Sequence, residues 1–173
     1  DPAATVADAV HAPPAPAGDQ AHPDGDMLVK MMQGYTQSQQ PALAVDLFEK
    51  QLAAGTALDE RHYTAHLQAH EALGSGREVL ERALEDMKAR GFVPDAAAYE
   101  AVLRSCTVGK DVVGNRAAAR AILDGMLEAG MGVSITAVQY ALTAHTLAKD
   151  LAAARELLNK LISGGHVGRD RAN

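Results

Sequence analysis

The chain has 173 residues, of which 47% are hydrophobic and 22% are charged, and its formal net charge at pH 7 is −6. This is the length of one globular domain, and the hydrophobic content is enough to build a core. Aromatic residues make up only 3% and tryptophan is absent. We therefore expect a core of aliphatic side chains and methionine, which favours packed helices over a sheet.

Several classes of protein are excluded at this point. The sequence has no run of about eighteen consecutive apolar residues, so we expect no membrane insertion. The single cysteine, Cys106, excludes a disulfide framework within the chain and is predicted to be a small core residue. Five aspartates and no Lys or Arg lie within residues 1–26, which leaves 16 basic and 17 acidic residues in the remainder. A near-neutral body lacks the basic footprint of a protein held on nucleic acid by charge.

Residues 1–25 are rich in proline and alanine and have no apolar periodicity, so they predict an extended leader. The leader contains no Arg and is therefore not itself a transit peptide, although its place is compatible with the stretch that follows the cleavage site of one. We expect the leader to contact a partner, because it should not fold alone.

The rest of the chain repeats. Glycines end a second helix at intervals of 36, 39 and 35 residues, at Gly55, Gly91, Gly130 and Gly165. Apolar or aromatic residues lie near the start of a first helix at intervals of 35, 36 and 39, at Leu28, Tyr63, Tyr99 and Val138. Two independent markers with one period predict about four antiparallel helix-turn-helix repeats stacked as an all-α solenoid.

We place the repeat domain at residues 26–169, followed by a short tail at 170–173. The units are 25–59, 60–95, 96–134 and 135–169. The first helices are predicted at 27–38, 60–73, 96–106 and 135–148. Their buried side is predicted to be supplied by Met31, Met32, Leu67, Val102, Leu103 and Leu142.

The second helices have clearer boundaries. Pro41 suits the first helical position of the first unit, followed by Leu43, and Ser75 with Glu78 predicts a capping box in the second. The third is predicted to be capped by Asn115, and the fourth to run from Asp150 to a glycine pair. Each closing glycine is expected to adopt the positive φ of a helix C-cap, which only glycine reaches without a Cβ penalty.

The units resemble those of the pentatricopeptide repeat family. The match consists of a unit of about thirty-five residues, Tyr63 or Tyr99 near the start of a first helix, Leu47-Phe48 inside a second helix, and the ending from Gly91 to Asp95 through Phe-Val-Pro. It covers residues 25–169 and implies a right-handed superhelix. A tetratricopeptide array fits less well, since its small eighth residue is replaced here by Met32, Leu67, Leu103 and Leu142.

The resemblance implies binding of single-stranded RNA in an organelle, with about one base read per unit by the fifth and last residues. By position the pairs are Val29 with Asp59, Thr64 with Asp95, Glu100 with Ser134, and Gln139 with Arg169. Only Thr64 with Asp95 resembles a family pairing, one associated with guanine. The second residues, which are usually apolar and wedge between bases, are here Asp26, Arg61, Ala97 and Thr136.

One competent pair among four units supplies little specificity, because reading one base is worth roughly 1 to 3 kcal/mol. The first helices also bear Lys30, Arg61 and Arg104 against Glu60, Glu71 and Glu100. We therefore interpret the chain as a non-catalytic scaffold or adaptor subunit of a large organellar assembly, such as a mitochondrial or chloroplast ribosome. Its expected partners are protein subunits that contact the solenoid surfaces and the leader, with ribosomal or other single-stranded RNA as a further partner.

Two alternatives stay open. One is an organellar single-stranded RNA-binding protein that acts in RNA processing, stability or translation, and the other is a helical-repeat adaptor that holds a peptide in its concave face. We expect a mitochondrial location, with the chloroplast as the alternative.

The sequence shows no motif of catalysis. His62, His66 and His70 are four apart and share one helical face, which is a pattern of metal ligands, but His70-Glu71 is not completed to a zinc-hydrolase motif and the repeat register makes His66 and His70 packing residues. Phosphate-cradling loops, nucleophile elbows and paired Cys-x-x-Cys elements are absent. We expect no catalytic residue, no metal site and no cofactor.

Overall fold

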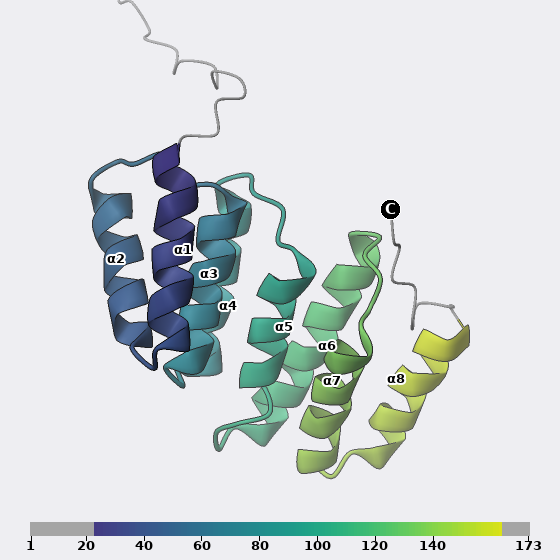
Figure 1. The fold of residues 1–173 in the computed structure, drawn as a ribbon. Coiled ribbons are helices and arrows are strands. Elements are labelled where there is room, and N and C mark those ends of the chain that lie inside the picture. Colours follow the sequence, from purple (N-terminus) through teal and green to yellow (C-terminus); the bar gives the residue numbers. More distant parts are fainter. Residues whose placement is uncertain (1–22, 164–173) are drawn as a thin grey trace, which may run out of the picture.

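The computed structural model describes residues 23–163, which form eight α-helices (Figure 1). They are α1 (Pro23–Gln37), α2 (Pro41–Ala53), α3 (Glu60–Ala72), α4 (Arg77–Ala89), α5 (Ala96–Ser105), α6 (Val112–Glu128), α7 (Ile135–Leu147) and α8 (Leu151–Ser163). Most of the predicted leader, the tail at 170–173, Gly165 and Arg169 lie outside the described residues.

The helices stack in chain order as four antiparallel pairs (Figure 1). The first helices α1, α3, α5 and α7 contact one another in series and form one layer. The second helices α2, α4 and α6 each pack against the first helix of their own unit and the first helix of the next. This arrangement confirms the predicted all-α solenoid, in which a unit gains its core from its neighbours.

The predicted helix boundaries hold to within one residue at α3, α5 and α7. Helix α1 begins at Pro23, four residues before the expected start and inside the predicted leader. Proline suits this position because the amide that it lacks has no partner in the first turn of a helix.

The closing glycines have the predicted conformation. Gly55, Gly91 and Gly130 have φ values of +72°, +85° and +69°, each just beyond the end of a second helix. First helices end in the same way, but with less suitable residues in two units, since Gln39 (φ +60°) and Lys149 (φ +57°) take the place that Gly74 holds in the second unit. In the first and second units a left-handed residue therefore follows both helices.

Two of the predicted starts of second helices are confirmed, and two of the predicted caps are wrong. Pro41 opens α2, and Asp150 accepts the backbone N–H of Ala153 at 3.0 Å at the start of α8. Ser75 and Glu78 form no capping box, because α4 begins one residue later with Gly76 as its cap. The Ser75 hydroxyl instead lies 3.0 Å from His70 Nδ1.

The third second helix begins before the predicted cap. Asp111 caps α6 and accepts the N–H of Gly114 at 3.0 Å. Asn115 is 5% exposed, and its side-chain amide donates to the carbonyl of Val108 at 2.8 Å. Asn115 therefore fastens the α5–α6 turn onto the helix and does not cap it.

The core consists of two clusters that meet at α3 and α4. The N-terminal cluster is the aromatic one, in which Phe48 packs edge-on against Tyr63 at 5.0 Å between ring centroids. Met32, Leu67, Val102 and Leu103 are fully buried as predicted, and Leu142 is partly buried against the C-terminal cluster. Met31, predicted to be buried, is 40% exposed, since among the described helices α1 packs against α2 and α3, and these leave this side of α1 uncovered.

Cys106 is fully buried in the C-terminal cluster, as expected of a small core residue. Burial is the main cause that raises the pKa of its thiol to about 12. A thiol with this pKa stays protonated near neutral pH and is a poor nucleophile.

Candidate nucleic-acid interface

The predicted base-reading positions occupy two structural places. The fifth residues Val29, Thr64, Glu100 and Gln139 lie in the first or second turn of a first helix. The last residues lie just before the next first helix, where Asp59, Asp95 and Ser134 are the N-caps of α3, α5 and α7. The last residue of a unit therefore caps the next first helix, because its side chain accepts hydrogen bonds from backbone amides that the helix start leaves unpaired.

Two of the four predicted pairs are brought together. Thr64 donates a hydrogen bond to Asp95 Oδ1 at 3.1 Å, across 31 positions of sequence. Ser134 donates to Glu100 Oε1 across 34 positions. Asp95 and Ser134 also accept the capping amides of Ala98 and Ala137. Each of these four side chains therefore forms a hydrogen bond within the protein through at least one polar atom.

The first pair shows no such contact, and the fourth lies partly outside the described residues. Val29 is 8% exposed and brings only an aliphatic side chain to the pair with Asp59. Asp59 instead caps α3 and binds the guanidinium of Arg61 at 2.7 Å. Gln139 is exposed on α7, and its partner Arg169 lies outside the described residues.

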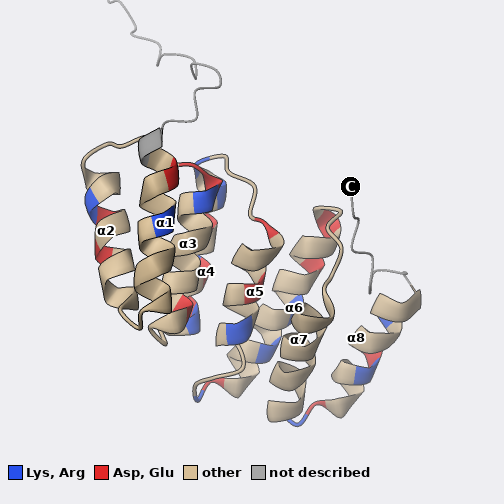
Figure 2. Cartoon of the chain, in the orientation of Figure 1, with Lys and Arg blue, Asp and Glu red and all other residues tan. Residues whose placement is uncertain are grey.

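Two of the three cations of the first-helix face, by which we mean the exposed side of α1, α3, α5 and α7, are paired with carboxylates; the third, Lys30, is exposed on α1 and forms no ion pair with a described residue. Arg61 bridges Asp26 and Asp59, so that two residues expected at the base-wedging place form an ion pair with each other. Arg104 lies 3.1 Å from Glu71. Figure 2 shows acidic and basic residues interspersed along the ribbon. This face therefore has no excess of positive charge to attract a phosphate backbone.

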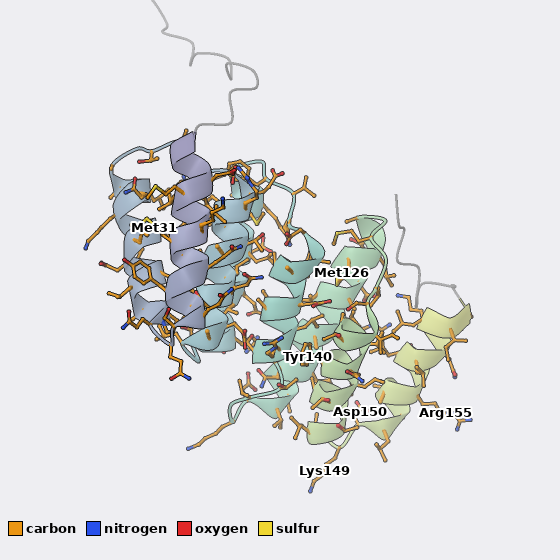
Figure 3. The ribbon with its side chains drawn as sticks, viewed as in Figure 1. Met31, Met126, Tyr140, Lys149, Asp150 and Arg155 are labelled. Atoms are coloured by element: carbon orange, nitrogen blue, oxygen red, sulfur yellow. The ribbon has the colours of Figure 1, made fainter. Side chains whose placement is uncertain are left out.

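Arg104 also joins the third unit to the fourth. Its Nε atom donates to the Tyr140 hydroxyl at 2.8 Å, and its guanidinium lies 5.3 Å from the centroid of the Tyr140 ring. Figure 3 shows Tyr140 on the side of α7 that faces α5. Glu71, Arg104 and Tyr140 thus form a chain of contacts that runs across three successive first helices.

Similar contacts recur one unit apart along the solenoid. Their members are separated by 31 to 36 residues: Arg61–Asp26, Thr64–Asp95, Arg77–Asp111, Arg104–Glu71, Arg116–Asp150, Ser134–Glu100 and Lys160–Asp124. This series of inter-unit contacts was not predicted from the sequence. The signal that would have found it is the separation itself, since opposite charges about one repeat apart lie side by side in a stacked array.

The three histidines of α3 do not converge on one point. His66 and His70 place their Nε2 atoms 3.1 Å apart, and the His66 ring stacks on Phe48 at 4.0 Å between centroids. His62 faces Asp59, with Nδ1 2.7 Å from Oδ1. Burial, followed by the charge of His70, lowers the pKa of His66 to about 3, and burial lowers that of His70.

Within residues 23–163 no group of three His, Cys, Asp or Glu side chains is placed to hold a metal ion. The histidines of α3 are best explained as packing and capping residues, and His66 fits the aromatic cluster as a neutral ring. None of the eight described helices combines the length and the apolar character needed to cross a membrane.

The fold and these contacts define a helical-hairpin solenoid whose unit length, tyrosine positions and helix ends agree with one repeat type. The sequence pattern of the family described as "Pentatricopeptide repeat-containing protein" matches residues 27–161. The chain belongs to this family, as its resemblance predicted. A comparison with curated protein sequences gives no match.

Solved structures support the same fold. The pentatricopeptide repeat protein PPR10, in complex with an 18-nucleotide psaJ RNA element, superposes with a TM-score of 0.62 at 18% sequence identity over 84% of this chain. A cysteine-to-serine variant of PPR10 with the same RNA element gives the same values. The chain spans only about a fifth (21%) of the length of these structures. At this identity the likeness is one of fold.

Proposed function

We propose that this chain is a non-catalytic scaffold subunit that holds protein neighbours within a large organellar ribonucleoprotein assembly, such as a mitochondrial ribosome. The observation that carries the proposal is the internal use of the polar groups on the first-helix face. Asp59, Asp95 and Ser134 cap helices, and Arg61 and Arg104 are in ion pairs. A base or a phosphate would have to displace these contacts.

Exposed apolar side chains on the first and last described helices support a role in holding neighbours. Met27 is 63% exposed on α1, and Leu151 and Ile162 are 68% and 63% exposed on α8. Large apolar side chains exposed on the outer helices of a stacked array are surfaces on which further elements pack. The proposal places these surfaces in contact with other subunits, and it places the assembly in the mitochondrion, with the chloroplast as the alternative.

The test measures two properties separately: the affinity of the chain for RNA and the protein subunits that copurify with it from native cells. Fluorescence anisotropy of the purified chain with a labelled 20-nucleotide RNA of random sequence should show only weak, salt-sensitive binding. Mass spectrometry of the assembly purified from native cells through a tag on the chain should recover stoichiometric protein subunits. Submicromolar affinity for a defined RNA by the chain alone, with no stoichiometric protein partner, would sink the scaffold proposal.

A second candidate function is sequence-selective RNA binding, which the Thr64–Asp95 contact favours. Both side chains lie side by side, 3.1 Å between Oγ1 and Oδ1, with Asp95 exposed. Under this alternative, Thr64→Asn should change the preferred base in a selection from a random RNA pool. The matched control is Ala89→Asn at the exposed end of α4, outside the base-reading positions, which should leave that preference unchanged. An unaltered preference in Thr64→Asn counts against this candidate.

A further inference from the structure

A groove of about 320 Å³ lies between the second helices α4 and α6, and Tyr99 of α5 forms part of its floor. The wall residues on each helix are three or four positions apart and span about two helical turns, from Glu81 to Lys88 on α4 and from Ala118 to Gly125 on α6. Because α4 and α6 are second helices, the groove is separate from the first-helix face. We refer to it as the α4–α6 groove.

The repeat register shows what is unusual about the α6 wall. In three units, the places nine and five residues before the closing glycine carry oppositely charged side chains: Asp46 and Lys50, Arg82 and Asp86, and Glu156 and Lys160. The third unit has Ala121 and Gly125 at the same two places, and both residues line the groove. The third unit therefore presents small residues where the other units present long charged ones.

The α6 wall is apolar and open to close approach. Ala121 is exposed, and a Cβ atom added to Gly125 would meet no other atom within 4 Å. Ala118 and Ile122, one turn apart on the same wall, are each 8% exposed. Small side chains let the axis of a neighbouring helix come near, so that its aliphatic side chains can reach the surface beneath. This wall suits a helix with aliphatic side chains.

The α4 wall is charged and has an excess of carboxylates. The side chain of Glu85 is 71% exposed and lies 3.1 Å from Lys88, in a surface pair of the kind that contributes little to stability. Glu81 shares Arg77 with two further carboxylates. A cation brought by a partner would therefore find a carboxylate at this wall, and Glu85 is the one that it can reach most easily.

Tyr99 supplies a second polar group next to that carboxylate wall. The residue is only 5% exposed, and its hydroxyl forms no hydrogen bond with a described residue although it is not fully covered. Buried hydroxyls usually have a partner, and a phenol oxygen can accept a hydrogen bond from a cation. Tyr140 has such a partner within the chain, since Arg104 donates to its hydroxyl at 2.8 Å.

We propose that the α4–α6 groove binds an amphipathic α-helix of a protein partner. Its aliphatic side chains lie against the α6 wall, and a lysine or arginine lies between Glu85 and Tyr99. The walls are two helices with no backbone edge to pair with a strand, so that a helix fits the groove better than an extended segment does. The inference deepens the proposed scaffold function and rests on it for the nature of the partner.

Two peptides test the chemistry of the occupant. The probe is a fluorescein-labelled, alanine-rich helical peptide of 18 residues with leucines and lysines on one side, and its twin has glutamates in place of the lysines. Fluorescence anisotropy with the full chain should show saturable binding of the lysine peptide, with a dissociation constant on the order of 10 to 100 µM. The glutamate peptide should bind at least tenfold more weakly. Equal affinities, or no saturation, would overturn the proposal.

A pair of double variants locates the site. Ala121→Arg with Gly125→Asp gives the third unit the charged pair of the second unit, which fills the groove and should weaken binding of the lysine peptide at least tenfold. The control is Ala53→Arg with Ala42→Asp, which adds the same two charges at exposed positions of α2 and should bind as the parent does. Unchanged binding by the groove variant overturns the proposal.

Charge reversal at the α4 wall tests the orientation of the helix. Glu85→Lys changes an exposed side chain, so the fold should be kept, and the variant should prefer the glutamate peptide over the lysine peptide. A preference for the lysine peptide that is as large as that of the parent would mean that the basic residue does not lie at Glu85, and the proposal would fail.

Other occupants give different results and each would overturn the proposal. Self-association of the parent in sedimentation velocity that is lost in the groove variant would assign the groove to a second copy. Loss of random-sequence RNA binding in the groove variant but not in the α2 control would assign it to nucleic acid. The RNA affinity of the parent and the native subunit composition decide the scaffold function independently of the peptide results.

Discussion

The hydroxyl of Thr64 and the first turn of α5 share one carboxylate oxygen of Asp95 as their acceptor. Thr64 Oγ1 donates to Asp95 Oδ1 at 3.1 Å, and the same oxygen accepts the backbone N–H of Ala98 at 2.8 Å. The second unit is thereby fastened to the third at the place where the family reading frame puts a base contact. A contact of this kind stabilises the stack whether or not a base ever reaches it.

Thr64→Val should lower the free energy of unfolding by about 1 kcal/mol, because the hydroxyl leaves while the shape stays nearly the same. Asp95→Ala should cost about 1 to 2 kcal/mol, since it removes the helix cap as well. Urea denaturation of the two single variants and the double variant measures their coupling, which should be about 0.5 to 1 kcal/mol. The exposed residue Gln139, changed to Ala, serves as the control and should stay within about 0.5 kcal/mol of the parent. Strict additivity would argue against the contact.

Two glycines of one repeat should respond to alanine in opposite directions. Gly125 lies inside α6 with nothing within 4 Å of an added Cβ, so Gly125→Ala should stabilise the fold by roughly 0.5 to 1 kcal/mol. Gly130 closes the same helix at φ +69°, and Gly130→Ala should destabilise it by about 1 kcal/mol. Thermal melts of both variants measure the contrast, and shifts of the same sign would contradict the assigned helix end.

The free energy of unfolding should depend on pH partly through His66. Burial lowers its pKa from 6.5 to about 3, so below pH 6.5 the unfolded chain binds a proton that the folded chain does not. Stability from this group is therefore complete above pH 7 and is lost, at up to about 1.4 kcal/mol per pH unit, as the pH falls from 6.5 toward 3. Urea denaturation between pH 5 and 7 avoids most carboxylate titration.

His66→Phe is the comparison, since a phenyl ring can keep the stack on Phe48 and has no proton to gain. Its free energy of unfolding should change less with pH than that of the parent over the same range. Equal slopes for the two chains would mean that His66 is not a buried neutral ring.

The period and the helix pairs were predictable from the sequence because they depend on local rules. A left-handed residue must follow each second helix, and glycine marks that place at Gly55, Gly91 and Gly130. The cap of α6 was not predictable in the same way. The stretch from Thr107 to Asn115 offers several polar residues, and only the packing of Asn115 against the carbonyl of Val108 decides that Asp111 is the cap.

The sequence predicts which positions of the candidate site lie side by side, but not which hydrogen bonds their side chains form. Counting along the unit places Thr64 beside Asp95 and Glu100 beside Ser134, and the structure has both contacts. Counting does not show which other groups share those oxygens. The exposure of Met31 was missed for a related reason: helical periodicity gives the apolar side of α1, but it does not say which part of that side the neighbouring helices α2 and α3 cover.

The ion pairs of the first-helix face should limit RNA binding. Asp26→Asn weakens the hold on Arg61, and Glu71→Gln frees Arg104 from its carboxylate, so the double variant leaves the face about two charges more positive. Random-sequence RNA should then bind more tightly at low salt. The slope of log affinity against log salt should steepen by about 0.7 for each cation that reaches a phosphate. Fluorescence anisotropy from 50 to 300 mM salt measures both effects.

Glu128→Gln with Asp46→Asn is the matched control, because it changes the net charge equally on the second helices α6 and α2, away from the first-helix face. If charge alone governs binding, the control will bind RNA as tightly as the test variant. If the first-helix face is the surface that RNA meets, only Asp26→Asn with Glu71→Gln will gain affinity. A gain that is confined to the first-helix variant would show that the carboxylates there act against RNA, which is the arrangement expected of a repeat array that holds protein neighbours.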